Sequence, residues 1–296
     1  MAVPRLDRMA TLCFFSPLRQ ALREKAGVRV PILMYHSVSD NLFGRSHPYF
    51  QINTLPQVFL RQMRWLHQNG YRTISMREML STMESGEKLP KRIVITFNRG
   101  YQDFYKSAFP ALKQFGFDAT VYLTTDRIHN ESMRMEGADY LTWSQVRELH
   151  GEGISFGSNT ATHADLRSLG LDQIDYELGY SKEKIEQNLG ASVDSFAYPL
   201  AFPEEDRIFT RFLVDVLENH GFEHGVSTII GRAGSCSNRY YLPRLPINSW
   251  DDTAFLRAKL QGGYDWLHWP QWFHKFVHHN VSIMQRSSLA ESRGSD

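Results

Sequence analysis

The stretch Arg92-Ile-Val-Ile-Thr-Phe-Asn-Arg-Gly-Tyr-Gln-Asp103 is the clearest indicator of the architecture of this chain. Its first six residues form a β-branched run, which predicts a short buried strand. The polar pair Asn98 and Arg99 stands at the carboxyl end of that strand, and Gly100 ends it. In parallel α/β folds the loops that leave the carboxyl ends of the strands converge, and ligands bind there. We therefore expect Asn98 and Arg99 to lie in a functional site.

Short apolar strands alternate with helices along most of the 296 residues. Such alternation favours parallel βαβ units, and at this length a closed or nearly closed barrel of roughly eight strands. The polar segment 125–140 is predicted to be a loop. The predicted strands cover residues 28–35, 71–75, 92–97, 119–124, 153–157, 193–199, 222–230 and 240–247. The predicted helices cover residues 55–69, 76–83, 103–115, 142–150, 172–189 and 209–220.

Composition restricts the class of protein. The chain is 42% hydrophobic and 22% charged, as is ordinary for a soluble globular protein. A formal net charge of +1 gives no basic excess for neutralising phosphates, which argues against nucleic-acid binding. Cys13 and Cys236 cannot form a disulfide framework and lack the spacing of a metal motif, which favours a reducing compartment.

Sequence patterns divide the chain into three predicted parts: an N-terminal helical extension over 1–27, a barrel over 28–252, and a C-terminal aromatic helix with a polar tail over 253–296. The apolar segment 9–18 has no clear small-residue cleavage site, so it is not a convincing signal peptide. It is expected either to pack on its own domain or to lie on a membrane surface, because arginines alternate with its apolar residues. We therefore expect a cytoplasmic or membrane-associated protein, with a peripheral membrane or a protein as a partner of the N-terminal or Trp-rich C-terminal segment.

Four further motifs accompany the central stretch in a fixed order. They are Tyr35-His36 after the first strand, Gly157-Ser-Asn-Thr-Ala-Thr-His163, Phe196-Ala-Tyr-Pro199, and the weaker Leu242-Pro-Arg-Leu-Pro246. Together with Thr96-Phe-Asn-Arg-Gly-Tyr101 they make the chain resemble the polysaccharide deacetylases, which are carbohydrate esterase family four with the NodB homology domain. The resemblance covers roughly residues 28–252 and implies a distorted (β/α)7-8 barrel. It also implies a polysaccharide or oligosaccharide as the ligand.

The resemblance assigns a role to each matching position. In the family an aspartate and two histidines hold Zn²⁺ or another divalent metal, and a second aspartate is the general base. Here the three metal positions hold Arg99, Asn159 and His163, and the base position holds Asn98. Only His163 keeps a ligand that the family uses. The positions implied in substrate binding are His36, Tyr101, Tyr198, Pro199 and Arg244, and His36 is equally well explained as a hydrogen-bonded core residue.

These substitutions oppose the chemistry of the family. Zinc sites in proteins use three or four ligands, and a guanidinium is always protonated and cannot coordinate a cation. A guanidinium about 4 Å from a divalent ion would cost several kcal/mol even at an effective dielectric near 20. Asn98 cannot accept a proton as a base. We therefore expect no bound metal cofactor and no metal-dependent deacetylation.

Three functions remain open. The favoured one is a non-catalytic domain of carbohydrate metabolism that binds a glycan or a partner, with Arg99 presenting its positive charge to a carbonyl or carboxylate. Equally, an acid such as Asp103 or Asp165 would pair with Arg99 and close the pocket. The alternative is an active hydrolase that removes N- or O-acetyl groups with a rewired site, using His163 or His36. The third is a structural subunit docked through its Trp-rich tail. His220 and His224 are expected at the surface.

Overall fold

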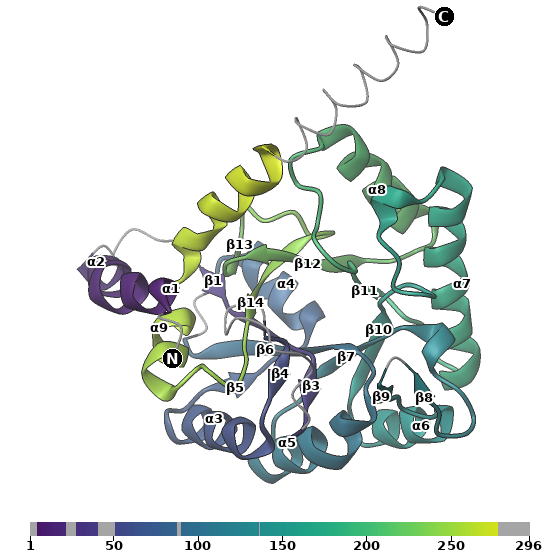
Figure 1. Ribbon diagram of the computed structural model, residues 1–296, viewed down its shortest axis with the longest axis horizontal. Coiled ribbons are helices and arrows are strands. Elements are labelled where there is room, and N and C mark those ends of the chain that lie inside the picture. Colours follow the sequence, from purple (N-terminus) through teal and green to yellow (C-terminus); the bar gives the residue numbers. More distant parts are fainter. Residues whose placement is uncertain (1–4, 22–27, 41–50, 88–89, 136, 278–296) are drawn as a thin grey trace, which may run out of the picture.

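Seven parallel strands close into a barrel with helices around it (Figure 1). The computed structural model describes residues 5–21, 28–40, 51–87, 90–135 and 137–277, and the barrel lies within this part of the chain. β2 pairs with both β14 and β6, which closes the ring and confirms the prediction of a (β/α)7-8 barrel. In spatial order the strands are β2 (Ile32–Tyr35), β14 (Leu242–Pro246), β12 (His224–Ile230), β11 (Ser195–Ala197), β10 (Ser155–Ser158), β7 (Thr120–Leu123) and β6 (Arg92–Arg99).

β6 is the longest of these strands, and its side chains alternate between the two faces of the barrel wall, as the period of a strand requires. Ile95 and Phe97 face the surrounding helices in the larger apolar cluster. Val94 belongs to the smaller cluster, which also contains Ile32 and Ala197 of other barrel strands. Asn98 continues the Val94 side of the strand and therefore points into the barrel.

Most of the helices that cover the barrel lie where helices were predicted, whereas the predicted helix over 103–115 is α-helical only from Phe109 and the helix over 253–260 was not predicted separately. Their ends carry the expected capping residues: Thr142 forms a capping box with Gln145, and Gly116 and Gly190 adopt the left-handed conformation as C-caps. The helices are α3 (Pro56–Gln68), α4 (Met76–Ser85), α5 (Phe109–Phe115), α6 (Trp143–Gly151), α7 (Leu171–Leu189), α8 (Arg207–Asn219) and α9 (Thr253–Leu260). A π-helical segment, η4 (Phe104–Ala108), precedes α5 and was not predicted.

Short pairings outside the ring account for the remaining differences. Pro31 separates β1 (Arg29–Val30) from β2, so the predicted first strand is divided in two. The segment 125–140, predicted to be a loop, contains the 3₁₀ helix η5 (Thr125–Arg127) and a small hairpin. The pairings are β1 with β13 (Ala233–Gly234), β3 (Ser37–Val38) with β4 (Asn53–Thr54), β8 (Arg134–Met135) with β9 (Ala138–Asp139), and β5 (Arg72–Thr73) with the start of β6. A third short helix, η6 (Leu166–Ser168), follows β10.

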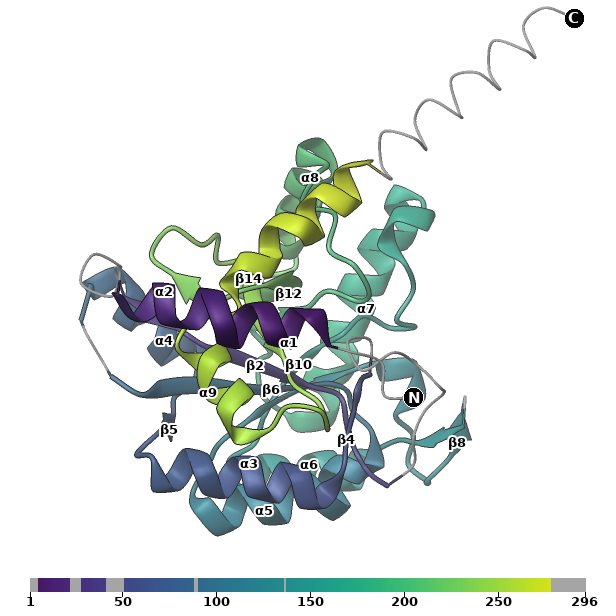
Figure 2. The ribbon, with the colours of Figure 1, turned by 60° about the vertical axis from the view of Figure 1, so that its left-hand side comes forward.

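The two ends of the described chain lie side by side on one flank of the barrel (Figures 1 and 2). The N-terminal run consists of α1 (Leu6–Ala10), the π-helical η1 (Thr11–Phe15) and α2 (Ser16–Ala21). The C-terminal run consists of η7 (Asp265–Leu267) and a helix over 268–277. Among the described residues, no helix has the length and apolar character needed to cross a membrane. The predicted polar tail over 286–296 lies outside the described residues, and the division into three parts stays a prediction.

Candidate functional site

Asn98 connects β6 to two neighbouring strands at the carboxyl end of the barrel. Its side chain is buried, and its Oδ1 accepts a hydrogen bond of 2.8 Å from Nη1 of Arg244 on β14. Its Nδ2 lies 3.4 Å from Nε2 of His36, which directly follows β2, so the ring nitrogen is the acceptor. An amide can make both contacts at once, because it carries an acceptor and a donor. Asn98 is therefore held in place as a structural link, with no capacity to act as a base.

Arg244 is a wholly buried cation beneath the site. Its Nε donates to the backbone oxygen of Ser227 at 2.8 Å, and its Nη1 also reaches Oγ1 of Thr96 at 3.3 Å. Its Nη2 is buried and has no hydrogen-bond partner in the structure. Burial lowers the pKa of Arg244 to about 10, which still leaves the guanidinium charged at neutral pH. No acidic side chain in the described part of the chain forms an ion pair with it.

Arg99 occupies a backbone conformation that is unusual for its type. Its φ is +74°, in the left-handed region, and the next residue, Gly100, has a φ of +73°. A Cβ on Gly100 would lie 2.6 Å from the Leu123 side chain, so only glycine fits there. The guanidinium of Arg99 is half-buried and donates to the hydroxyl of Tyr101 at 3.1 Å, while its Nε is buried without a partner. The chain thus turns sharply at the end of β6 and presents a cation at the site.

The end of β10 supplies Asn159 and His163. Asn159 turns its Nδ2 to the backbone oxygen of Ala197 on β11, at 2.8 Å, and its buried Oδ1 has no hydrogen-bond partner. Thr160 and His163 both have positive φ values, of +66° and +65°, and the Thr160 hydroxyl accepts from the backbone N–H of His163 at 2.9 Å. This turn holds the His163 ring, which is half-buried, beside the end of β6.

Positive charge dominates this cluster, which we call the strand-end cluster: His36, Asn98, Arg99, His163 and Arg244. Burial, followed by the charges of Arg244 and Arg99 and by His163, lowers the pKa of His36 to about 3. Burial and then Arg99 lower the pKa of His163 to about 4. Both rings are therefore neutral at pH 7, and every charged group that shifts the pKa of His36 is cationic. No acidic side chain among the described residues forms an ion pair with either arginine, so both contribute positive charge at this end of the barrel.

The strand-end cluster does not fit a divalent metal. Two of the three positions that the family uses for metal hold a guanidinium and an amide, and the amide nitrogen of Asn159 is engaged with the backbone. The charge of Arg99 acts on His163, the remaining candidate ligand, and would repel a cation there. The described residues contain no group of three or more His, Cys, Asp or Glu side chains that would hold a metal ion.

The aromatic positions taken as substrate contacts lie deeper than expected. Tyr198 is 1% exposed, packs edge-on against Phe202 and has a pKa raised by burial. Tyr101 is 5% exposed and lies against Tyr140. Arg244 is fully buried as well, so all three side chains are buried in this structure, and their contact with a sugar stays a prediction. The buried Pro199 follows Tyr198, so His36, Arg99 and His163 are the half-buried members of the predicted set.

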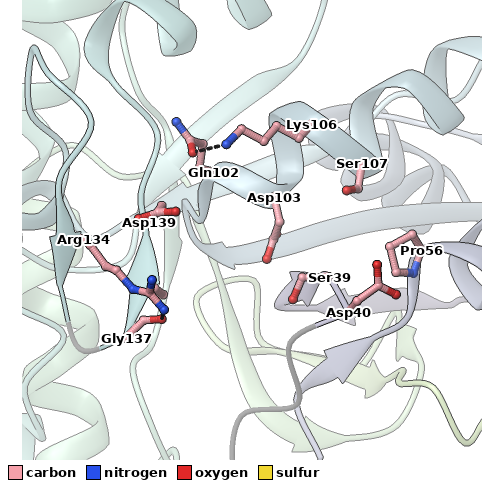
Figure 3. Close-up of a pocket in the computed structure, with 11 residues that line it drawn as sticks. Ser39, Asp40, Pro56, Gln102, Asp103, Lys106, Ser107, Arg134, Gly137 and Asp139 are labelled. Atoms are coloured by element: carbon pink, nitrogen blue, oxygen red, sulfur yellow. Dashed lines mark hydrogen bonds between the residues drawn. The ribbon is translucent and has the colours of Figure 1, made fainter.

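A cavity of about 390 Å³ lies between η4 and the β8–β9 hairpin, and no member of the strand-end cluster lines it (Figure 3). Asp103 lines it together with Lys106, Arg134 and Asp139, so both signs of charge face the space. The Asp103 carboxylate accepts from the Ser37 hydroxyl, and burial raises its pKa. Sequence reasoning did not predict this cavity, because the hairpin that forms one wall was read as a loop.

Asp103 and Asp165 were the two acids expected to pair with Arg99, and the structure gives both of them other partners. Asp103 bonds to Ser37, and Asp165 caps η6 by accepting from the backbone N–H of Arg167. Within the described residues neither acid forms an ion pair with Arg99. The prediction that His224 lies at the surface is wrong, since it begins β12, is 2% exposed and has a pKa lowered by burial. His220 ends α8 and pairs with Asp175 across to α7.

Comparison with known proteins agrees with the fold. The family model for polysaccharide deacetylase matches residues 85–225. YxkH of Bacillus subtilis, a protein named as a polysaccharide deacetylase, is 30% identical over 229 residues, which cover 77% of this chain and 74% of the relative. The chain belongs to the polysaccharide deacetylase family.

Other members of the polysaccharide deacetylase family are similar over most of this chain. The poly-β-1,6-N-acetyl-D-glucosamine N-deacetylase of Staphylococcus aureus is 25% identical over 260 residues, covering 81% of this chain and 84% of the relative. The structure of the deacetylase PplD of Streptococcus pyogenes, solved with acetate, superimposes with a TM-score of 0.66 at 25% identity. It covers 79% of this chain and 99% of PplD.

Proposed function

We propose that this member of the polysaccharide deacetylase family binds a polysaccharide without deacetylating it. The observation that carries the proposal is the guanidinium of Arg99 at the end of β6, where the family resemblance expects a metal-binding aspartate. Arg99 presents a fixed positive charge and hydrogen-bond donors to the carbonyl or carboxylate of a glycan. His36 and His163, both neutral at pH 7, border the same space and offer further hydrogen bonds.

Two features of the strand-end cluster support binding over hydrolysis. Asn98 already uses its amide oxygen for Arg244, and an amide has no useful basicity for activating water. The cationic surroundings favour an anion or a carbonyl dipole and disfavour a second cation. We propose accordingly that no metal cofactor is bound and that the ligand is held in place by the arginine.

The alternative is an active hydrolase that does not use the metal of the family. Asp103 is the specific observation in its favour, because it is an acid with a raised pKa at the wall of a cavity. Groups of this kind serve as general acids or bases in enzymes. The bond from Ser37 to Asp103 gives it an equally good structural role. Relatives named as N-deacetylases are a second reason to test this alternative.

The decisive experiment measures metal content, turnover and binding on the same preparation. Deacetylation of an N-acetylated chito-oligosaccharide and of poly-β-1,6-N-acetyl-glucosamine is assayed with and without added Zn²⁺, and binding is measured by calorimetry. We expect no stoichiometric metal, no acetate release, and glycan binding that weakens about tenfold in Arg99→Ala, as for loss of a charge-assisted hydrogen bond. The control is Arg211→Ala, since Arg211 is an exposed arginine on α8.

Each result distinguishes the readings. Acetate release that disappears in Asp103→Asn and persists without metal would establish the rewired hydrolase and refute the proposal. One equivalent of metal with turnover would mean that other side chains have replaced the lost ligands. Glycan binding that is equal in the Arg99→Ala and Arg211→Ala proteins would remove Arg99 from the site.

A further inference from the structure

The N-terminal helical run exposes an apolar face, although Leu12 and Phe15 of the same run pack toward the protein. A helix that packs on a soluble domain normally buries its apolar stripe and exposes polar residues. Here every exposed residue between 5 and 18 is apolar or a cysteine. These residues are Leu6, Met9, Cys13, Phe14, Pro17 and Leu18, and the four large ones are between 55% and 72% exposed.

The polar residues of the same run are turned toward the protein. Asp7 accepts from the hydroxyl of Tyr264 at 2.9 Å, and Thr11 accepts from Nε1 of Trp266 at 3.1 Å. Phe15 stacks on the Trp266 ring, with centroids 4.6 Å apart. The run is therefore anchored by specific contacts, and its apolar face is held outward by them.

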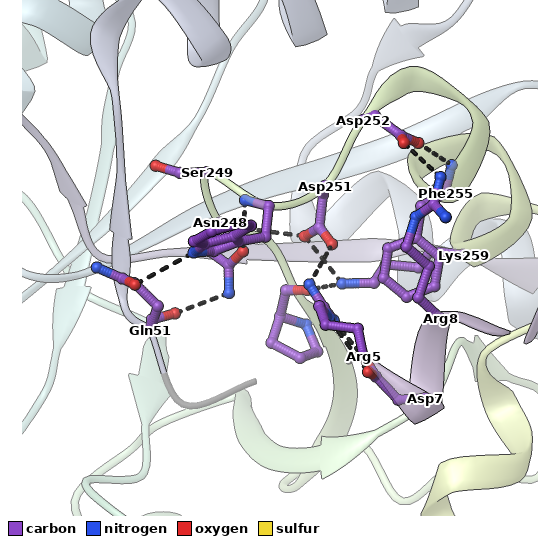
Figure 4. A network of polar contacts seen from close by, with 12 residues as sticks. Arg5, Asp7, Arg8, Gln51, Asn248, Ser249, Asp251, Asp252, Phe255 and Lys259 are labelled. Atoms are coloured by element: carbon purple, nitrogen blue, oxygen red, sulfur yellow. Dashed lines mark hydrogen bonds and ion pairs between the residues drawn. The ribbon is translucent and has the colours of Figure 1, made fainter. Parts of the chain in front are cut away.

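A polar network fixes the start of this run to the barrel (Figure 4). Arg5 lies 3.5 Å from a carboxylate oxygen of Asp251, and Lys259 on α9 pairs with the same carboxylate at 2.9 Å. Arg8 pairs with Asp252. Buried ion pairs need good geometry to offset desolvation, so this network defines the orientation of α1 and keeps it from rotating its apolar face inward.

A second exposed apolar face begins directly after Trp266. On the helix over 268–277 the exposed positions are Trp269, Pro270, Phe273, His274, Phe276 and Val277. Trp269 is 74% exposed and Phe273 is 61% exposed. Because Trp266 is stacked on Phe15, this helix starts beside the N-terminal run, and both lie on the same flank of the barrel in Figures 1 and 2. We call the two faces together the aromatic flank.

Charge identifies the occupant of the aromatic flank. Arg5 and Arg8 are paired with acids, but residues 19–29, at the end of the run and after it in the sequence, contain four lysines and arginines and one acidic residue, whereas the whole chain has a net charge of only +1. A basic segment with an apolar face rich in Leu, Met and Phe, together with Trp and Phe next to it, is typical of helices that lie in the interface of an anionic bilayer. We propose that the aromatic flank binds the surface of an anionic lipid bilayer, with the N-terminal run lying parallel to the membrane plane.

This lipid-binding site is separate from the strand-end cluster and does not depend on the proposed function. Exposed large apolar side chains gathered on one flank mark an interaction site, and the basic sequence over 19–29 favours anionic lipid over a second copy of this chain, which would carry the same charge. Insertion of the exposed Phe14 and Trp269 side chains below the headgroups removes their apolar area from water.

The test is co-sedimentation of the full chain with vesicles of phosphatidylcholine containing phosphatidylglycerol, compared with phosphatidylcholine alone. We expect binding to the anionic vesicles and binding at least about tenfold weaker in the double variant Phe14→Gln/Trp269→Gln, as for loss of two inserted aromatic side chains. The matched control is Ile208→Gln on α8, whose side chain is 87% exposed outside the flank. It should bind as the parent does.

Three outcomes would overturn the proposal. Equal binding by the double variant and the parent would show that the flank does not insert. Equal binding to neutral and anionic vesicles would refute the role of charge. A dimer seen by light scattering that disappears in the double variant, with no vesicle binding by the parent, would assign the flank to a second copy of the chain. Circular dichroism of each variant checks that the fold is kept.

Discussion

Asn98→Asp would place a carboxylate 2.8 Å from the buried guanidinium of Arg244. It would also remove the Nδ2 donor to His36, so the neutral His36 ring must change tautomer and donate from Nε2 to the new carboxylate. Two unit charges about 4 Å apart attract by about 4 kcal/mol at an effective dielectric of 20, and Arg99 adds to that attraction. Desolvation of the new carboxylate opposes this with several kcal/mol, whereas Arg244 is already desolvated. The attraction and the desolvation cost therefore nearly cancel. The net gain agrees with the general observation that a hydrogen bond to a charged group stabilises a protein by about 1 kcal/mol more than a neutral one. We therefore expect the variant to be about 1–2 kcal/mol more stable at pH 7.

The pH dependence gives this prediction its sign. The neighbouring arginines depress the pKa of the new carboxyl in the folded state below the unfolded value of about 3.9. The added stability is therefore present above about pH 4 and is lost as the pH falls through the folded pKa. Urea denaturation at several pH values measures it, with Asn130→Asp as the control, because Asn130 is exposed.

A loss of stability at pH 7 in Asn98→Asp would refute the reasoning. It would mean that desolvation outweighs the two arginines and that the strand-end cluster is not positively charged overall. An equal effect of Asn130→Asp would likewise remove Arg244 as the cause. The proposal that Arg99 binds an anionic or carbonyl group would then lose its electrostatic basis.

Three further predictions follow from local geometry. Gly100→Ala should cost about 2–4 kcal/mol of unfolding free energy, through a positive φ and a clash, whereas Gly116→Ala, with open space, should cost about 1 kcal/mol; equal costs would contradict this. Asp251→Asn should cost about 3–5 kcal/mol by thermal or urea denaturation, because Lys259 is 1% exposed and loses its carboxylate; a neutral result would show that water replaces it. NMR titration of the His163 ring should give a pKa near 4, below its ordinary 6.5. Because the unfolded state binds this proton more tightly, protonation of His163 lowers the free energy of unfolding as the pH falls from 6.5 toward 4. A pKa near 6.5 would place the ring outside the cationic cluster.

The barrel was predictable from sequence because its signals are local. The cap at Thr142 and the glycine stop at Gly190 both mark helix ends at the residues where the structure has them. The β-branched run over 92–97, followed by a polar pair, predicted that Asn98 and Arg99 lie at the carboxyl end of a strand, and they end β6. The strand period puts Asn98 on the same side as Val94, and the closed ring of the structure makes that side the interior of the barrel.

What sequence did not reveal depends on contacts between distant residues. Arg244 and Asn98 are 146 positions apart, and only the closed ring brings their side chains to 2.8 Å. His224 falls inside the strand predicted over 222–230, and its burial follows from its place at the start of β12, where neighbouring elements that the sequence does not reveal cover it. The outward apolar face of the N-terminal run results from partners at Tyr264 and Trp266, about 255 positions away.

The sharp turn at the end of β6 also determines what protein engineering can do with this barrel. Asparagine and aspartate tolerate a left-handed backbone better than arginine, so Arg99→Asp should relieve strain rather than add it. The tight turn at Thr160 and His163 also has a left-handed backbone, and it already holds the imidazole ring of His163 in position. Exchange of Asn98 and Arg99 for the aspartates that the family resemblance expects there should therefore need no redesign of the loop after β6.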